Sequence, residues 1–272
     1  MASEDPFDSA LDLLRRLNPA DTAKNVEAIC ALNPSLTEDL LESVDVPLAV
    51  KKCSRTGREF LCCDYNRDGD SWRSPWSNQF EPPVEDGEGV VPSERVRKIE
   101  VAANEAFDTY RELYYEGGIS SVYLWDVDDG FAGCVLLKKT VAPSVKSGSG
   151  AWDSIHVFEA LDRPRAAHYK LTSTIILNLG MKADALGKMD LAGNLVRQVE
   201  QDAAVEHDGS HVANIGRMVE DMEIKMRNQL QEVYFGKAKD VVGDLRSLQP
   251  LSETNRDRET QREMISNMTN RG

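Results

Sequence analysis

The sequence predicts an α+β protein in which helices and an antiparallel sheet occupy separate stretches of the chain. Apolar residues recur at helical spacing near both ends, and a period of two takes over from Ser120. The segments with period two are joined by short turns, which connect antiparallel neighbours. We therefore expect a meander in the middle of the chain rather than a parallel α/β sheet.

The composition is that of a globular chain and excludes several classes of partner. Hydrophobic residues make up 41% of the 272 residues, enough for a sizeable core. The formal net charge of −14 argues against a nucleic-acid partner. The five cysteines show no spaced pairs, so we expect a reducing compartment and no disulfide framework. No apolar signal core opens the sequence, and no apolar run approaches the ~18 residues of a membrane helix.

Residues 1–45 are expected to form an N-terminal antiparallel bundle of three short helices. The first begins at Asp5-Pro6, and Asn-Pro pairs end the first two. The third is expected to begin at Ser35, with Glu38 completing a capping box. The connections are short enough to force antiparallel neighbours.

Residues 46–92 are expected to form a small module of strands and loops, because short apolar pieces alternate with Gly, Pro, Asp and Ser. Aromatic residues gather in its loops, interleaved with Arg67 and Arg73. This cluster fits either a local core beneath a long loop, which we favour, or part of a binding surface. Its aromatic members are Tyr65, Trp72, Trp76 and Phe80.

Residues 93–117 are expected to form a connecting helix that Ser93 caps and Gly117-Gly118 ends. One apolar face is predicted for it: Val96, Ile99, Ala103, Ala106, Tyr110 and Leu113.

Residues 118–202 are expected to form a five-stranded antiparallel meander, with a hairpin turn at Asp128-Asp129-Gly130. A long helix over residues 203–247 follows, and its apolar stripe is expected to cover one face of the sheet. The stripe comprises Ile215, Val219, Met222, Met226, Leu230 and Val233.

Residues 248–272 are expected to form a separate amphipathic tail. Pro250 interrupts the preceding helix, Ser252 can cap a new one, and Met264 and Met268 lie one turn apart on a mostly polar surface. The tail fits either a frayed terminus or a helix that docks in a groove of another protein.

The segment CDYNRDGDSWRS (63–74) is similar to the opening of an EF-hand calcium loop. The resemblance fails at position twelve, where Pro75 replaces the bidentate glutamate. We therefore favour a rigid turn in which Asp64 and Asp68 accept backbone N–H groups, with Tyr65 and Trp72 packed beneath.

His207 and His211 have the spacing of a two-histidine metal face, yet no HExxH or CxxC motif accompanies them. We expect them to be solvent-facing residues at a helix start. No catalytic constellation can be argued from spacing, so we predict no enzyme, no metal and no cofactor. The alternative is a metal-binding enzyme subunit built on the Asp64 loop and this histidine pair.

Several long blocks of the sequence carry a resemblance to one family. They are CDYNRD (63–68) and the GDSWRSPWSNQFEPPVEDG that follows it, YYEGGISSVYLWD (114–126), WDSIHV (152–157), AHYKLTST (167–174), ANIGRMVEDME (213–223) and YFGKAKDVV (234–242). In order and spacing they resemble the beta-subunit family of F-actin capping protein, from about residue 8 to about residue 265.

The resemblance implies an obligate heterodimer with a similarly folded alpha subunit around a pseudo-two-fold axis, with one continuous sheet and the N-terminal helices as a stalk. It implies calcium-independent capping of the barbed end of actin filaments in the cytoplasm and cortical cytoskeleton, which blocks subunit addition and loss. Capping the actin-like minifilament of dynactin is the alternative for the same heterodimer.

The resemblance also implies site residues. The tail at 248–272 corresponds to the actin-binding tentacle, although Thr260 and Asn267 make it more polar than the family pattern. Regulators implied by the family are scaffold peptides, myotrophin-like inhibitors and phosphoinositides. The expected actin-binding residues are Arg246, Arg256, Arg258, Arg262, Met264 and Met268, and the expected regulator-binding residues are Arg15, Arg16, Trp76 and Phe80.

Overall fold

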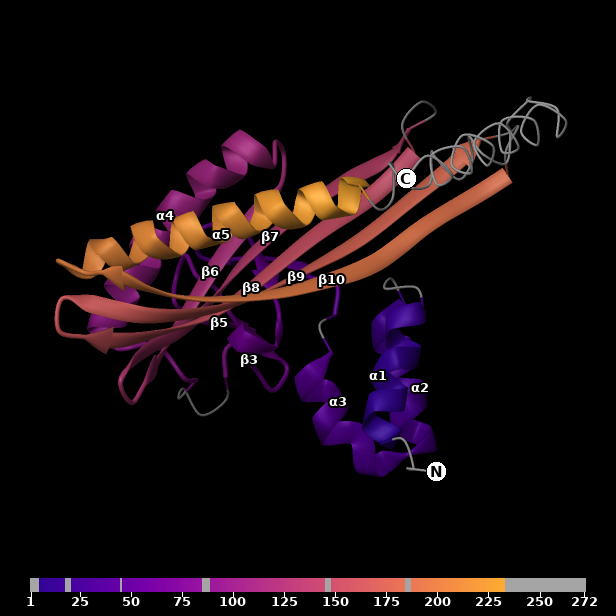
Figure 1. Ribbon diagram of the computed structural model, residues 1–272, viewed down its shortest axis with the longest axis horizontal. Helices are drawn as coiled ribbons and strands as arrows, with labels where there is room; N and C mark the ends of the chain where they lie inside the picture. The colour runs from indigo at the N-terminus through magenta and orange to yellow at the C-terminus, as the bar shows by residue number, and fades with distance from the viewer. Residues whose placement is uncertain are drawn as a thin grey trace, which may run out of the picture. The chain divides into compact units, whose positions relative to one another are not determined.

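The computed structural model describes residues 5–17, 21–44, 46–84, 89–144, 148–183 and 187–232 (Figure 1). The chain divides into two compact units, residues 1–224 and 225–272, and only the end of one helix is described in the second. No helix in the described ranges is long and apolar enough to span a membrane.

Three helices form near the N-terminus: α1 (Pro6–Arg16), α2 (Thr22–Leu32) and α3 (Thr37–Ser43). The predicted start of α1 is confirmed, because the backbone N–H of Phe7 donates to Asp5 Oδ1 at 3.0 Å. The predicted capping box of α3 is wrong. Pro34 begins a 3-10 turn through Leu36, so Ser35 lies inside that turn and bonds to Asn33 Oδ1 instead.

The module that follows contains a hairpin and a three-stranded sheet. The hairpin pairs β1 (Ala49–Lys52) with β2 (Glu59–Cys62), and a 3-10 turn, η3 (Asp64–Asn66), leads into β3 (Arg67–Asp68), β4 (Ser71–Arg73) and β5 (Phe80–Glu81). Gly69 has a φ of 55° in the β3–β4 turn, a left-handed conformation that glycine adopts without strain.

The connecting helix α4 (Glu94–Tyr114) begins as predicted, with Ser93 Oγ accepting from the Val96 N–H. Its buried face differs from the prediction at the C-terminal end, where Leu113 is 73% exposed and Ala106 is also exposed. The buried face includes two polar residues, Glu100 and Asn104, which bond to the neighbouring strand and turn that side of the helix inward.

The central sheet is an antiparallel meander of five long strands, which confirms the predicted fold class at this level. Its order is β10-β9-β8-β7-β6, so each strand pairs with its neighbour in sequence. The Asp128–Gly130 turn joins the first two strands as predicted. The strands are β6 (Ile119–Val127), β7 (Gly130–Ser144), β8 (Gly148–Arg163), β9 (Ala166–Ala183) and β10 (Gly187–Ala204).

The long helix α5 spans Asp208–Gln231, and its part up to Ile224 lies along one face of the sheet, as predicted (Figure 1). Ile215, Val219 and Met222 of the predicted stripe are buried, and so are Met226 and Leu230 further along the helix. Val233 and the predicted helical residues beyond it, to 247, lie outside the described residues.

Candidate functional site

The CDYNRD loop is fixed by the side chain of Asn66. Asn66 Oδ1 accepts from the Cys63 N–H at 2.9 Å, and Asn66 Nδ2 donates to the Arg73 carbonyl at 2.9 Å. The expectation that Asp64 and Asp68 fix the turn is wrong, because both are exposed and the described backbone bonds belong to Asn66. An amide can donate and accept at once, whereas a carboxylate only accepts, so only the asparagine can join the two ends of the loop.

This geometry also removes the calcium interpretation of the loop. The third EF-hand position is Asn66, which is buried and whose Oδ1 accepts from the Cys63 N–H, whereas Asp64 and Asp68 are exposed. Among the described residues, no group of three or more His, Cys, Asp or Glu side chains is placed to hold a metal ion.

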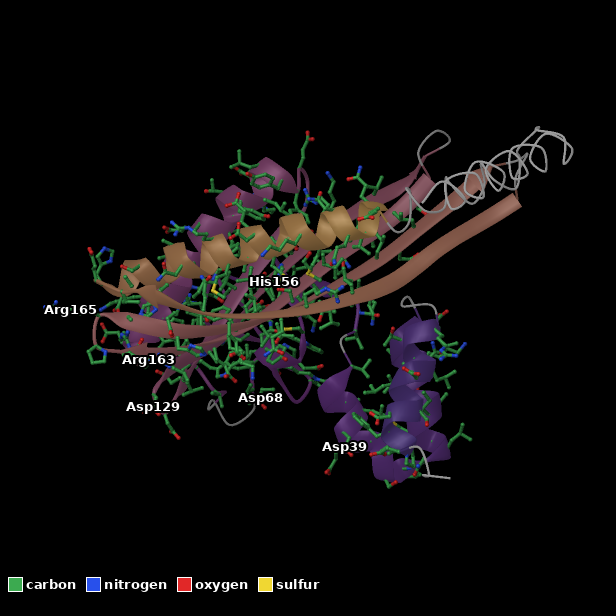
Figure 2. The ribbon with its side chains drawn as sticks, viewed as in Figure 1. Asp39, Asp68, Asp129, His156, Arg163 and Arg165 are labelled. Atoms are coloured by element: carbon green, nitrogen blue, oxygen red, sulfur yellow. The ribbon has the colours of Figure 1, made fainter. Side chains whose placement is uncertain are left out.

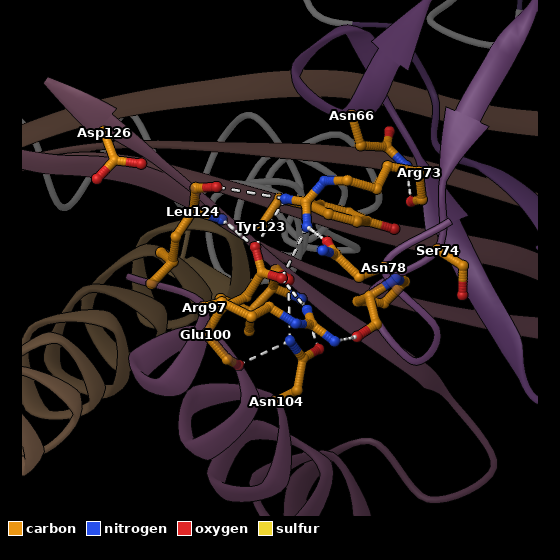
Figure 3. Close-up of polar contacts among 12 residues, drawn as sticks. Asn66, Arg73, Ser74, Asn78, Arg97, Glu100, Asn104, Tyr123, Leu124 and Asp126 are labelled. Atoms are coloured by element: carbon orange, nitrogen blue, oxygen red, sulfur yellow. Dashed lines mark hydrogen bonds and ion pairs between the residues drawn. The ribbon is translucent and has the colours of Figure 1, made fainter. Parts of the chain in front are cut away.

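Arg73, which follows the loop on β4, forms a buried ion pair with Glu100 of α4 (Figure 3). The two guanidinium nitrogens of Arg73 lie 2.8 and 2.7 Å from the two carboxylate oxygens, with Arg73 4% and Glu100 0% exposed. Arg97 also donates to Glu100, and Arg73 donates to Asn78 Oδ1 at 2.7 Å. Two guanidinium groups therefore neutralise one buried carboxylate, which offsets the large desolvation cost of that charge.

The same junction closes the outer edge of β6. The Leu124 N–H donates to Glu100 Oε2 at 2.6 Å, and Arg73 Nη2 donates to the Leu124 carbonyl at 3.3 Å. Two residues earlier on β6, the Val122 N–H donates to Asn104 Oδ1 and the Val122 carbonyl accepts from Asn104 Nδ2, both at 2.9 Å. An edge strand with its backbone groups bonded in this way offers no template for another strand at these positions.

The aromatic residues of the module form a local core, which confirms the favoured interpretation for two of them. Trp72 and Trp76 pack on the buried side chains of Cys53, Phe60 and Cys62.

Tyr65 lies apart from that core. Its ring stacks on Trp125 of β6 at a centroid distance of 5.4 Å and an interplanar angle of 5°, while the side chain stays 45% exposed. Phe80 is half-buried on β5.

A second buried junction joins the sheet to α5. His156 of β8 lies beneath the helix, with Nδ1 2.8 Å from Ser173 Oγ and Nε2 2.9 Å from Glu223 Oε1 (Figure 2). Tyr115 also donates to Glu223, at 2.5 Å. Burial raises the pKa of Glu223, but the bonds from His156, Ser154 and Tyr115 outweigh it and lower the pKa below the ordinary glutamate value.

His211 does not face solvent, so that prediction is wrong, whereas His207 is exposed as expected. His211 lies in the first turns of α5, where its Nδ1 is 2.8 Å from Tyr169 Oη and its ring meets Phe131 edge-on. Burial lowers the pKa of His211, and its Nε2 lies 3.5 Å from Asp162 Oδ1. The two histidines therefore occupy different environments and do not form one metal face.

The predicted actin-binding residues lie outside the described residues and stay predictions: Arg246, Arg256, Arg258, Arg262, Met264 and Met268. The side chain of Arg15 is likewise not among the side chains that the structure describes. Arg16 is exposed and lies 3.5 Å from Asp12, and Trp76 Nε1 donates to the Glu59 carbonyl at 2.9 Å. No described contact joins Arg16 to Trp76 or Phe80, and the assignment of these residues to a regulator-binding surface stays a prediction.

Sequence reasoning missed the polar junctions because their partners are far apart in the chain. One signal was present. Glu100 and Asn104 are polar, one turn apart, and fall on the same side of α4 as Val96, Ile99 and Ala103. Two polar residues inside an apolar helix face require buried partners.

The described fold and junctions define an α+β protein whose buried polar residues join its elements to one another. Residues 7–242 match the family described as F-actin capping protein, beta subunit. The chain belongs to that family.

Similar proteins from distantly related organisms carry the name of the same subunit. The chain is 71% identical to the F-actin-capping protein subunit beta of Aspergillus oryzae, over 96% of this chain and 97% of that one. It is 52% identical to the same subunit of Caenorhabditis elegans, over 99% of both chains. The structure of a homodimeric actin capping protein alpha subunit from Plasmodium berghei shares the fold, with a TM-score of 0.53 at 14% identity over 90% of this chain and 96% of that one.

Proposed function

We propose that this chain is the beta subunit of a heterodimeric actin-capping protein, which binds the barbed end of actin filaments without calcium and blocks subunit addition and loss. Membership of the beta-subunit family, over residues 7–242, carries this proposal. The protein acts by binding, not catalysis, and works in the cytoplasmic cytoskeleton, including its cortical structures.

The two edges of the central sheet differ, and this difference supports pairing with an alpha subunit. The edge at β6 is closed by side chains of α4 and of the loop module at Val122 and Leu124. The other edge is β10, an 18-residue strand that pairs only with β9 in the described sheet. A long edge strand is a template for pairing, so a similarly folded alpha subunit would continue the sheet there around a pseudo-two-fold axis.

The finer organisation follows the same proposal. Residues 1–45 form an antiparallel three-helix stalk, 46–92 the strand and loop module and 93–117 the connecting helix. Residues 118–202 carry the sheet, whose last strand runs on to Ala204, residues 203–247 carry the long helix, which begins at Asp208, and residues 248–272 form the actin-binding tentacle. Because the partner completes the core, the chain alone is expected to be poorly soluble.

The tentacle is expected to contribute to capping without carrying it alone. Burial of the Met264 and Met268 side chains contributes about 3–5 kcal/mol before the cost of ordering the segment. Arg256, Arg258 and Arg262 add electrostatic attraction to an acidic filament surface, although the whole chain is acidic.

Barbed-end elongation kinetics test the proposal. The chain is co-expressed with an alpha subunit, and pyrenyl-actin elongation from filament seeds is followed as the heterodimer is titrated. We expect elongation to stop, with the same result in EGTA. Deletion of 250–272 is expected to weaken capping by about tenfold or more and to leave the heterodimer intact.

The exposed residue Lys24 of α2 provides a control, because Lys24→Glu changes a surface charge outside the deleted segment. Elongation that continues at saturating heterodimer would refute the function. Equal capping by the truncated heterodimer would refute only the role of the tail.

For the scaffold-peptide surface, Arg16→Glu is expected to weaken binding of a scaffold peptide in a pull-down or anisotropy assay. Unaltered affinity would remove Arg16 from that surface.

A further inference from the structure

The β1–β2 hairpin is a basic island in an acidic chain. Residues 49–62 contain four basic residues and one acidic residue, a net charge of +3, in a chain of net charge −14. Glu59, the acidic residue, stands opposite Lys52 in the strand register. The basic residues are Lys51, Lys52, Arg55 and Arg58.

Two of these cations are held in place by the local core. Lys51 Nζ lies 3.5 Å from the ring centroid of Trp72, and Arg58 Cζ lies 3.5 Å from that of Trp76. Arg58 also pairs with Asp108 of α4 at 3.0 Å, so Lys51, Lys52 and Arg55 are the cations that an acidic partner would face. Both indoles pack on the same buried cluster. Cation–π contacts hold charged groups that are otherwise mobile, so less conformational entropy is lost when a partner binds them.

The inner edge of the hairpin, formed by β2, is already bonded. The Leu61 N–H donates to Ser121 Oγ at 2.9 Å, and the Leu61 carbonyl accepts from Tyr123 Oη at 2.7 Å. The Glu59 carbonyl accepts from Trp76 Nε1 at 2.9 Å. Side chains therefore occupy three of the backbone groups that β2 directs away from β1.

The outer edge, formed by β1, is open. The Cys53 N–H donates to the Arg58 carbonyl, which fixes the alternation of an antiparallel pair and turns the backbone groups of Val50 and Lys52 away from β2. Within the described residues, these outward groups have no hydrogen-bond partner, and both side chains are exposed.

We propose that the outer edge of β1 binds an extended acidic segment of a partner protein, which adds to the hairpin as a third strand. Main-chain bonds to Val50 and Lys52 provide the ladder, and carboxylates of the segment face the cations of the hairpin. Lysine on an edge strand discourages pairing with neutral or basic strands. The same charge therefore selects an acidic strand over the others.

The test uses the full chain in complex with an alpha subunit and a fluorescein-labelled peptide of alternating Glu and Val. We expect saturable binding by fluorescence anisotropy that weakens as NaCl rises from about 50 to about 300 mM. The double variant Lys52→Glu/Arg55→Glu is expected to bind about tenfold more weakly. These two residues are exposed and make no described contact with the tryptophans, so their replacement leaves the local core intact.

Controls separate strand addition from simple charge attraction. Lys24→Glu, in α2, is expected to change affinity by no more than about twofold. A peptide N-methylated at alternate residues loses the donors of one edge and is expected to bind about tenfold more weakly. A peptide with Lys in place of Glu is expected not to bind.

Four results would overturn the proposal: no saturable binding of the Glu-Val peptide, equal binding of the N-methylated peptide, equal loss in Lys24→Glu, or no loss in the double variant. Vesicles of phosphatidylserine and phosphatidylcholine are tested in parallel. Binding to the vesicles, without binding to the peptide, would show that the hairpin recognises a lipid surface instead.

Discussion

Replacement of Glu100 by glutamine is expected to destabilise the protein severely. Glutamine has the same shape but no charge, so Arg73, which is 4% exposed, loses its counter-ion inside the protein. The new NH₂ group also faces donors, because both carboxylate oxygens accept bonds from Arg73 and one accepts from the Leu124 N–H. Removal of one partner of a buried pair costs about 3–5 kcal/mol. That is a large share of a typical stability of about 5–15 kcal/mol.

Urea unfolding of the heterodimer at fixed protein concentration measures this effect. The control is Glu94→Gln on the same helix, where the carboxylate is 86% exposed, and we expect a change within about 0.5 kcal/mol. The double variant Arg73→Met/Glu100→Gln removes the stranded cation and is expected to be less destabilised than the sum of the single variants. A loss below about 1 kcal/mol for Glu100→Gln, or strict additivity in the cycle, would refute this account of the junction.

Two further predictions concern other buried groups. Asp153 accepts from the Leu48 N–H at 2.8 Å and pairs with Lys138 at 2.7 Å. Asp153→Asn is therefore expected to lower the free energy of unfolding by about 2–4 kcal/mol and to speed amide hydrogen exchange at Leu48. Unchanged exchange at Leu48 would contradict this prediction. Because burial lowers the pKa of His211, its contribution to stability is present above the unfolded pKa of about 6.5 and is lost as pH falls through the folded pKa. Melting temperatures of wild type and His211→Gln between about pH 7.5 and 5.5 should therefore show a weaker pH dependence in the variant, and parallel curves would count against this role.

Local signals in the sequence were sufficient for the elements whose contacts are local. The Asp128–Gly130 turn and the period of two predicted the β6–β7 pairing, and Ser93 predicted the start of α4. Each of these depends on residues within a few positions of one another. Ser35 failed as a cap although its signal was also local, because Pro34 begins a 3-10 turn that moves the helix start to Thr37.

The candidate site was less predictable, because it depends on pairs that are distant in sequence. Arg73 and Glu100 are 27 positions apart, and His156 and Glu223 are 67 apart, so no spacing rule joins them. His211 has the sequence pattern of an exposed helix start, but its contacts with Tyr169 and Phe131 bury it. The expected actin-binding residues lie in a segment that the structure does not describe.

The junction at Glu100 has a consequence for synthesis on the ribosome. Arg73 is translated before the three partners of its guanidinium, Asn78, Glu100 and Leu124, and the Leu124 carbonyl lies 51 residues further along the chain. At about 5–20 residues per second, the guanidinium waits about 3–10 s for the last of them. During that time the module carries a cation whose final environment excludes water. The strands β6 to β10 pair with their neighbours in sequence and can form as they emerge, whereas the loop module cannot complete its contacts with Arg73 until β6 has been synthesised.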